Sequence, residues 1–299
     1  MKTLAKFILI TEALLLSTPS IAQSDVSDVS EELKIAAVEA LIAAPADKAL
    51  PLVTKVLEGN HSNEVKERAL FILSQIDQPE AQSTLLKVAR ENQNDLGLEA
   101  VLMIGISGND ESLASLASIY ENGNSEAREA VLEAYMIAGD KQSVFNIALT
   151  AEGDDFDEAI EMLSVMGARD ELRELRGKTG VSEALIQAYA ISGDFESLRE
   201  LALDGSDVEL QTQAIEAMGI VGGEQVDSTL VEIYRSATAE GVREAALHGM
   251  LISGHDAGVL ELYRSSQDPS EKKQLLEFLV MTGSDEVWNI IDSTLTGDQ

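Results

Sequence analysis

Small and apolar residues recur along the chain in one spacing pattern. Between Val242 and Ser253 they occupy offsets 0, 3, 4, 7, 8 and 11, and Gly254 follows directly. These offsets place the residues on one face of an α-helix, and a glycine after such a face is typical of a left-handed helix end. Similar runs begin at Ala127, Val181, Gln211 and Glu271. A helix that returns about every 30 residues indicates an array of repeats.

An alanine on this apolar face marks the first helix of each repeat. The marked positions are Ala37, Ala69, Ala100, Ala130, Ala159, Ala184, Ala214 and Ala245, with Leu275 at the equivalent place in the last unit. A shorter second helix follows, after a turn in which a residue such as Asp140, Asp194 or Ser284 can cap the next helix. We therefore predict an all-α fold, an α-solenoid of about nine stacked helical hairpins over residues 30–299.

The repeat near residues 155–179 is irregular. Successive markers are 29 to 32 residues apart, except that Ala184 follows Ala159 after only 25. The second helix of this repeat, predicted over Asp170–Lys178, is short and charged. A shortened repeat can bend the array or form a seam between two sub-arrays, or it can be a loop deletion without consequence.

The first 22 residues have the features of a secretory signal peptide. Lys2 and Lys6 precede the apolar stretch Phe7–Leu16, and Ser20-Ile21-Ala22 fits a cleavage site. The alternative is a short buried or amphipathic first helix. We expect a periplasmic or secreted protein that does not insert into a membrane once the signal is removed.

The segment after the predicted signal is polar. Residues 23–29 form a lead-in, and a helix is predicted to start at Ser30 and to end before Pro45. The second helix is predicted over Lys48–Leu57, with a turn at Gly59.

Charge and composition narrow the classes of partner. The chain of 299 residues carries 53 acidic and 21 basic side chains, a net charge of −32, which repels nucleic acid and anionic lipid. Such a surface is either a solvated coat without a specific role or a steering field for a basic protein. With aromatics at 4%, the core has to consist of aliphatic side chains, and the absence of cysteine excludes disulfides and thiolate chemistry.

Three segments resemble a known repeat family. They are Val242–Leu247 followed by Ile252–Asp256, Val65–Leu70, and Ala127–Val131. Each is similar to the short HEAT-like repeat of phycobilisome-lyase-type proteins, and the similarity covers roughly residues 30–295. The resemblance implies an α-solenoid that holds another macromolecule or, in a few members, attaches a pigment. Ser182 and Thr212 replace the basic residue of the motif, and no residue of the lyase activity can be carried over to this chain.

Basic side chains form one candidate for partner binding. Arg169, Arg173 and Arg176 lie on one face of the irregular repeat's second helix, with Lys178 nearby. In a chain this acidic, the stripe can receive a carboxylate or an acidic segment of a partner. The alternative is local pairing with Asp170, Glu171 and Glu174.

Aromatic side chains of the second helices form the other candidate. The residues are Tyr120, Tyr234 with Arg235, Tyr263 with Arg264, and Trp288. HEAT-like arrays usually present their second helices on the concave face, so the resemblance implies that these side chains are contact anchors. Packing between helices is the alternative explanation.

No residue stands out for catalysis or for cofactor or metal binding. The pair His248 and His255 and the acidic segment Gly153–Glu158 are the weak metal candidates, and the acids equally suit a helix N-terminus. We predict a non-catalytic exported scaffold that binds a protein or peptide in envelope complex assembly, and the acidic surface favours a basic partner. The alternatives are an enzyme or enzyme accessory with a small-molecule pocket near the short repeat, and a cation-regulated structural protein.

Overall fold

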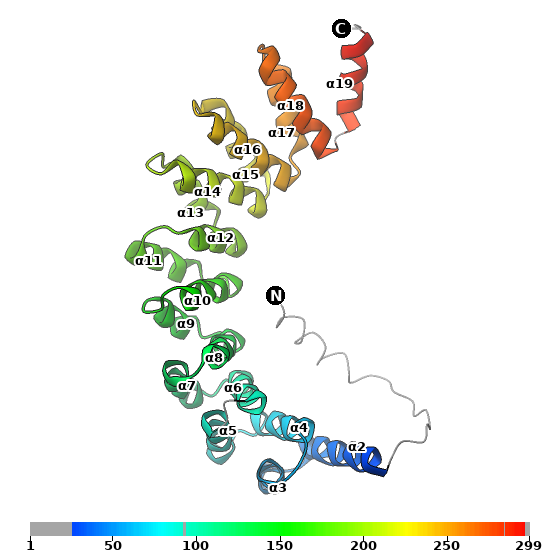
Figure 1. The fold of residues 1–299 in the computed structure, drawn as a ribbon, viewed down its shortest axis with the longest axis vertical. Coiled ribbons are helices and arrows are strands. Elements are labelled where there is room, and N and C mark those ends of the chain that lie inside the picture. The colour runs from blue at the N-terminus through cyan, green and yellow to red at the C-terminus, as the bar shows by residue number, and fades with distance from the viewer. Residues whose placement is uncertain (1–25, 92–93, 284, 297–299) are drawn as a thin grey trace. The chain divides into compact units, whose positions relative to one another are not determined.

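The computed structural model describes residues 26–91, 94–283 and 285–296, and it is helical throughout that range (Figure 1). Within these residues there are 18 α-helices and no strand, and in chain order they form nine pairs. The prediction of an all-α, HEAT-like stack is confirmed. The predicted signal peptide, residues 1–22, lies outside the described residues.

Each pair consists of a first and a second helix. The first helices are α2 (Val26–Glu39), α4 (Asn63–Ser74), α6 (Asp95–Ser107), α8 (Ser125–Ala138), α10 (Asp154–Val165), α12 (Glu183–Ser192), α14 (Val208–Val221), α16 (Glu240–Ser253) and α18 (Pro269–Thr282). The second helices are α3 (Ala46–Glu58), α5 (Pro79–Glu91), α7 (Asp110–Asn122), α9 (Lys141–Ala148), α11 (Arg169–Thr179), α13 (Phe195–Leu203), α15 (Glu224–Ser236), α17 (Asp256–Ser265) and α19 (Asp285–Thr296).

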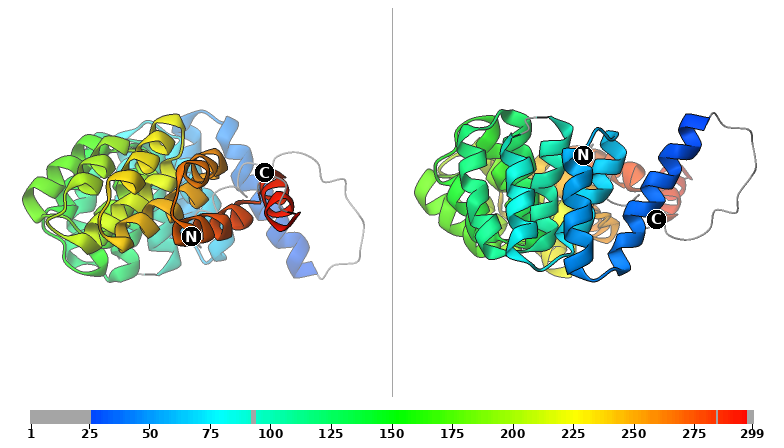
Figure 2. Two further views of the ribbon diagram at one scale, coloured as in Figure 1. Left: turned by 90° about the horizontal axis from the view of Figure 1, so that it is seen from above. Right: turned by 90° about the horizontal axis from the view of Figure 1, so that it is seen from below.

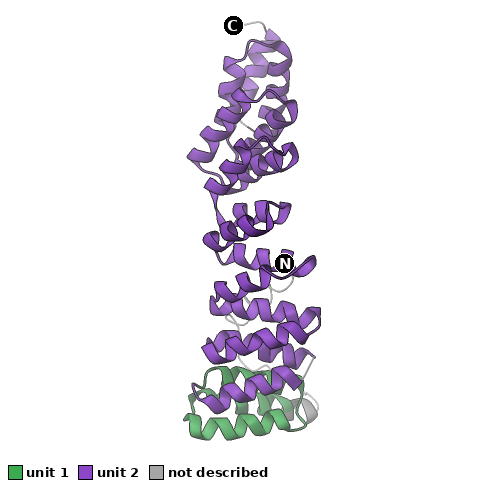
Figure 3. Cartoon of the chain, turned by 90° about the vertical axis from the view of Figure 1, so that its left-hand side faces the viewer, with its two compact units in different colours: residues 1–76 green, residues 77–299 purple. Residues whose placement is uncertain are grey.

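The chain divides into two compact units, residues 1–76 and 77–299 (Figure 3). In unit 1, α2 begins at Val26, four residues before the predicted start at Ser30, and a 3₁₀ turn over Ala40–Ala43 precedes Pro45. No helix in the described residues is both long enough and apolar enough to cross a membrane.

Glycine and aspartate set the turn inside a pair. Gly139 and Gly193 have φ values of 74° and 69°, a left-handed conformation that other residues rarely adopt. The next residue caps the second helix: Asp140 accepts a hydrogen bond from the amide of Ser143 at 3.0 Å, and Asp194 does the same for Ser197. The predicted caps at these two turns are confirmed, and Ser284 lies outside the described residues.

In unit 2, the first helices pack most extensively where α14 meets α16 and where α6 meets α8, whereas successive second helices touch at few points. The green and yellow helices of this unit lie side by side in Figure 2. A Cβ atom added to Gly219 of α14 would lie 2.4 Å from the carbonyl oxygen of Gly249 in α16, and one added to Gly105 of α6 would lie 2.6 Å from that of Ala134 in α8. Small residues thus bring neighbouring backbones into contact, and the first helices form the inner row of the local bend. The resemblance implied the opposite arrangement.

The short repeat arises from a missing helical turn rather than from a loop deletion. Helix α12 has 10 residues, whereas α8, α14 and α16 each have 14. Ala184 is the second residue of α12, while the marker Ala130 is the sixth residue of α8, so the missing turn is the N-terminal one. The second helix α11, with 11 residues, is longer than α9 or α13, so the prediction that this helix is the short element is wrong. Leu172 and Leu175 of α11 are fully buried.

The contact between α14 and α16 makes a testable prediction. Gly219→Ala should lower the free energy of unfolding by about 2 kcal/mol, because the added methyl group meets the Gly249 backbone and forces the two helices apart. Gly177→Ala is the matched control, since nothing lies within 4 Å of a Cβ at that exposed position of α11. The control should stabilise the chain by about 0.5 kcal/mol through helix propensity. Urea unfolding followed by circular dichroism measures both changes, and equal effects would contradict the packing argument.

Candidate partner-binding surface

The three arginines of α11 bind the next pair of helices. Arg169 donates from Nε to the carbonyl oxygen of Ser192, the last residue of α12, at 2.7 Å. Arg173 donates from Nε and Nη2 to the two carboxylate oxygens of Asp194, at 2.8 and 2.6 Å. Arg176 donates from Nη1 to Glu200 of α13 at 3.1 Å. The stripe therefore holds the turn between α12 and α13.

Asp194 is the buried member of this cluster. Its side chain is 1% exposed, and it accepts hydrogen bonds from the Ser197 amide and hydroxyl as well as from Arg173. Burial alone would raise the pKa of the Asp194 carboxyl, but the hydrogen bonds from Arg173 and Ser197 outweigh burial and hold this pKa below its usual range. Asp194 therefore stays ionised at neutral pH, and its stabilising contribution is lost only as the pH falls through its lowered pKa.

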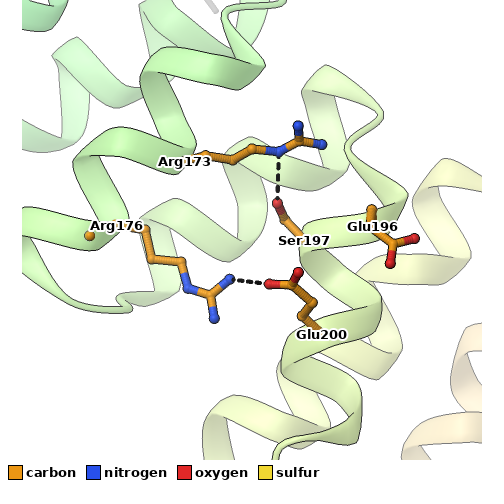
Figure 4. A pocket seen from close by; sticks show the side chains of 6 residues that line it. Arg173, Arg176, Glu196, Ser197 and Glu200 are labelled. Atoms are coloured by element: carbon orange, nitrogen blue, oxygen red, sulfur yellow. Dashed lines mark hydrogen bonds and ion pairs between the residues drawn. The ribbon is translucent and has the colours of Figure 1, made fainter.

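A shallow depression of about 420 Å³ lies beside this cluster, and Arg176 and Glu200 are among the residues that line it (Figure 4). Its charged side chains already have partners: Arg173 pairs with Asp194, Arg176 with Glu200, and Glu196 with Arg199. Pairing within α11, the alternative, accounts for some of the contacts: Arg173 Nη1 lies 3.7 Å from Asp170, and Lys178 pairs with Glu174 at 2.7 Å. The strongest partners of the stripe lie on α12 and α13, which spacing within α11 could not reveal.

The aromatic candidates lie mostly between helices. Tyr234 is buried and donates its hydroxyl to Glu271 at 3.1 Å. Tyr263 is half-buried under the ammonium of Lys272. Tyr120 is also half-buried, and its hydroxyl has no hydrogen-bond partner in the described part of the chain. Only Trp288, 60% exposed, presents most of its surface to solvent.

The arginines beside these tyrosines join consecutive second helices. Arg235 lies 2.6 Å from Glu261, and Arg264 lies 3.0 Å from Glu286. Both pairs are largely exposed and connect α15 to α17 and α17 to α19.

The metal candidates are directed to other partners. His248 Nδ1 lies 3.1 Å from Glu216, and His255 Nδ1 lies 3.2 Å from Asp227. In the acidic segment Gly153–Glu158, α10 begins at Asp154, so the carboxylates occupy a helix N-terminus. The described residues contain no cluster of three or more side chains arranged to hold a metal ion.

An aliphatic column on the first helices was missed by the sequence argument. Each member stands two residues before the turn glycine: Val165, Ile191, Ile220, Ile252 and Met281, on α10, α12, α14, α16 and α18. All five side chains are between 51% and 59% exposed. Single exposed aliphatics are common on proteins, but the same position in five successive repeats is not a scattered pattern.

A polar column runs beside the aliphatic one. Its members stand six residues before the turn glycine: Glu133, Glu161, Gln187, Glu216, His248 and Glu277. Residues four apart on a helix share a face, so each first helix presents one polar and one aliphatic side chain side by side. The contact between His248 and Glu216 shows that the polar column is continuous from α14 to α16.

Carboxylates cluster on this face near α8 and α10 and make the electrostatic potential there negative. Partial burial, followed by the charges of Glu129 and Asp155, raises the pKa of Glu158 to about 7. The carboxylates of Glu161 and Glu133 act in the same direction. Several like charges therefore meet where two first helices pack.

A protein family and a solved structure are similar to the chain. A family model described as HEAT repeats matches residues 20–103 and 57–136. The structure of the complex of CpcE and CpcF of phycocyanin lyase from Nostoc sp. PCC7120 is similar to the chain at 16% sequence identity and a TM-score of 0.34, over 90% of this chain and 99% of that one. No curated protein matches the chain in sequence.

The ion pair between Arg173 and the buried Asp194 should contribute more to stability than the exposed pair between Arg176 and Glu200. Arg173→Met should lower the free energy of unfolding at pH 7 by about 2 kcal/mol, because it leaves the charge of Asp194 buried without a cation; half-exposure of Arg173 keeps the loss at the low end. Arg176→Met, the same substitution one turn away, should lose about 0.5 kcal/mol, since its partner Glu200 is 61% exposed. Thermal unfolding compares the two variants. A larger loss for Arg176→Met would show that Asp194 does not depend on the arginine.

The contribution of Glu158 to stability should depend on pH in the opposite direction to that of Asp194, because its pKa is raised rather than lowered. Its pKa is raised in the folded state, so its neutral form stabilises the fold at low pH, and this contribution is lost as the pH rises from about 4.5 towards 7. Glu158→Gln keeps the side chain neutral and should stabilise the chain at pH 8 by about 1 kcal/mol, a reduced value because the group is part-exposed and screened. At pH 5 the gain should be much smaller.

The control for this experiment is Glu152→Gln, which neutralises an exposed carboxylate just before α10. Melting temperatures of the native chain and both variants, measured from pH 5 to pH 8, provide the comparison. A gain for Glu158→Gln that is the same at both ends of the range would contradict the raised pKa.

Proposed function

We propose that the protein is a non-catalytic scaffold that binds a protein partner on the first helices of unit 2. The observation that carries the proposal is the aliphatic column, in which five consecutive repeats each expose one aliphatic side chain at the same position. Water contact with these groups is unfavourable, and covering them with a partner would remove it. A stack of helices provides a long surface on which many small contacts add up.

Export and a place in envelope complex assembly are parts of the same proposal. The support for export is the sequence pattern of residues 1–22, a basic start followed by an apolar stretch and a small-residue cleavage site. The net charge of −32 would draw a basic partner and repel acidic surfaces.

The alternative function, an enzyme or enzyme accessory with a small-molecule pocket near the short repeat, has one observation in its favour. The depression beside Arg173 and Arg176 lies at that repeat. An anionic ligand would have to displace Asp194 and Glu200 from these arginines, and Glu196 adds a further negative charge. We therefore favour the scaffold.

Affinity capture from the native envelope fraction tests the proposed function. The full chain should retain one or more proteins, and a variant with Val165, Ile191, Ile220 and Ile252 changed to serine should lose them. The control replaces Leu203 and Val208, which are 60% and 55% exposed but lie outside the column, with serine. Retention by the control and loss by the column variant would support the proposal, while equal retention by both would refute it.

A further inference from the structure

We propose that the aliphatic and polar columns together form a docking surface for a basic amphipathic helix of the partner protein. This inference rests on the proposed function and adds the chemistry and shape of the ligand. Neither the arginine stripe nor the aromatic residues enter it, because their groups are mostly engaged within the chain.

The spacing of the columns suits a helix laid across the repeats. Neighbouring packed helices are about 8–10 Å apart, and an α-helix advances about 10.5 Å in seven residues. A partner helix with an apolar residue at every seventh position, supported by others three or four residues on, would therefore meet one aliphatic side chain in each repeat. To meet the five positions from Val165 to Met281, five apolar residues spaced seven apart call for a helix of about 29 residues.

Two adjacent columns require a ligand with two different sides. On each first helix, the polar and aliphatic side chains are one helical turn apart, as are Glu216 and Ile220. A partner that covered only the aliphatic column with apolar groups would leave carboxylates at its edge without a counter-charge. An amphipathic helix avoids this, since lysine or arginine beside its apolar stripe would lie over the carboxylates.

The sign of the charge selects the partner and its orientation. Carboxylates stand in the polar column at Glu161 and Glu216, and further acids lie one turn earlier, at Asp157, Glu183 and Glu244. A cation enters this face near the C-terminal end, where Lys273 lies 4.0 Å from Glu277. The basic residues of the partner should therefore gather over α10 to α14. A second copy of this chain would bring a further charge of −32 and be repelled.

The test uses the full chain and two synthetic peptides of about 29 residues, long enough for five apolar residues spaced seven apart. One places leucines on a single helical face with lysines along one edge; the other has the same composition in a scrambled order. Fluorescence anisotropy should give at least tenfold tighter binding for the amphipathic peptide. Changing Ile191, Ile220 and Ile252 together to serine should weaken it at least tenfold, while the Leu203 and Val208 control should leave it unchanged.

A matched pair of charge variants separates the columns from the general acidity of the chain. Glu161→Gln with Glu216→Gln should weaken binding of the amphipathic peptide at least fivefold and reduce its dependence on salt. Glu224→Gln with Glu232→Gln removes the same charge from exposed positions of α15 and should change binding less than twofold. Circular dichroism melting of every variant confirms that the fold is retained.

Three outcomes would overturn the inference: equal binding of both peptides, equal effects of the two charge variants, or self-association of the chain that the aliphatic substitutions abolish. The last would make a second copy the occupant. Capture of an envelope protein that depends on the aliphatic column, together with failure of the amphipathic peptide, would reject the helix as ligand and leave the proposed function standing.

Discussion

The close approach of successive first helices is the constraint on which unit 2 depends. Glycine inside a helix is unfavourable by about 1 kcal/mol relative to alanine, yet Gly105, Gly219 and Gly249 all lie in helix interiors. Each lies where the backbone of a neighbouring first helix comes within contact distance of a Cβ position. Small residues at these two crossings, α6 with α8 and α14 with α16, give up helix propensity in exchange for inter-repeat packing.

Polar contacts between one second helix and the turn of the next pair supplement this packing. Arg173 of the second helix α11 donates to the capping residue Asp194 in the next turn. Two repeats later the second helix supplies the acceptor instead: Asp227 of α15 accepts a hydrogen bond from Ser253 and lies beside His255. Lys141 donates to the carbonyl oxygen of Gly167 at 3.4 Å, as Arg169 does to Ser192. The contact is most extensive at α12, the helix that lacks its N-terminal turn. A helix with less apolar surface to bury gains from arginines that fix its C-terminal end and the turn after it.

The sequence predicts the repeat well and the exposed surface poorly, for physical reasons. Apolar spacing and the glycine–aspartate turns depend on interactions within a few residues, so the pairs and the caps at Asp140 and Asp194 could be read directly. The partners of Arg173 could not, because the choice between Asp170 and Asp194 depends on how α11 lies against the next pair. The aliphatic column could not be predicted either, because spacing alone does not show whether offset 10 of the repeat, occupied by Ile252, faces solvent or a neighbouring helix.

The face that carries the columns is also where the chain departs from what stability alone would favour. Elsewhere local preferences and packing agree, as in the buried tyrosines Tyr135 and Tyr189, whose hydroxyls donate to carbonyl oxygens of preceding second helices at 3.2 and 3.3 Å. Around Glu158, by contrast, like charges from α8 and α10 converge, and ionising this half-buried carboxyl near neutral pH lowers the free energy of unfolding. Exposed aliphatics on the same helices are a second departure. The proposed partner, a basic amphipathic helix, would relieve both departures at once, because its cations would offset the like charges and its apolar side would cover the aliphatic column.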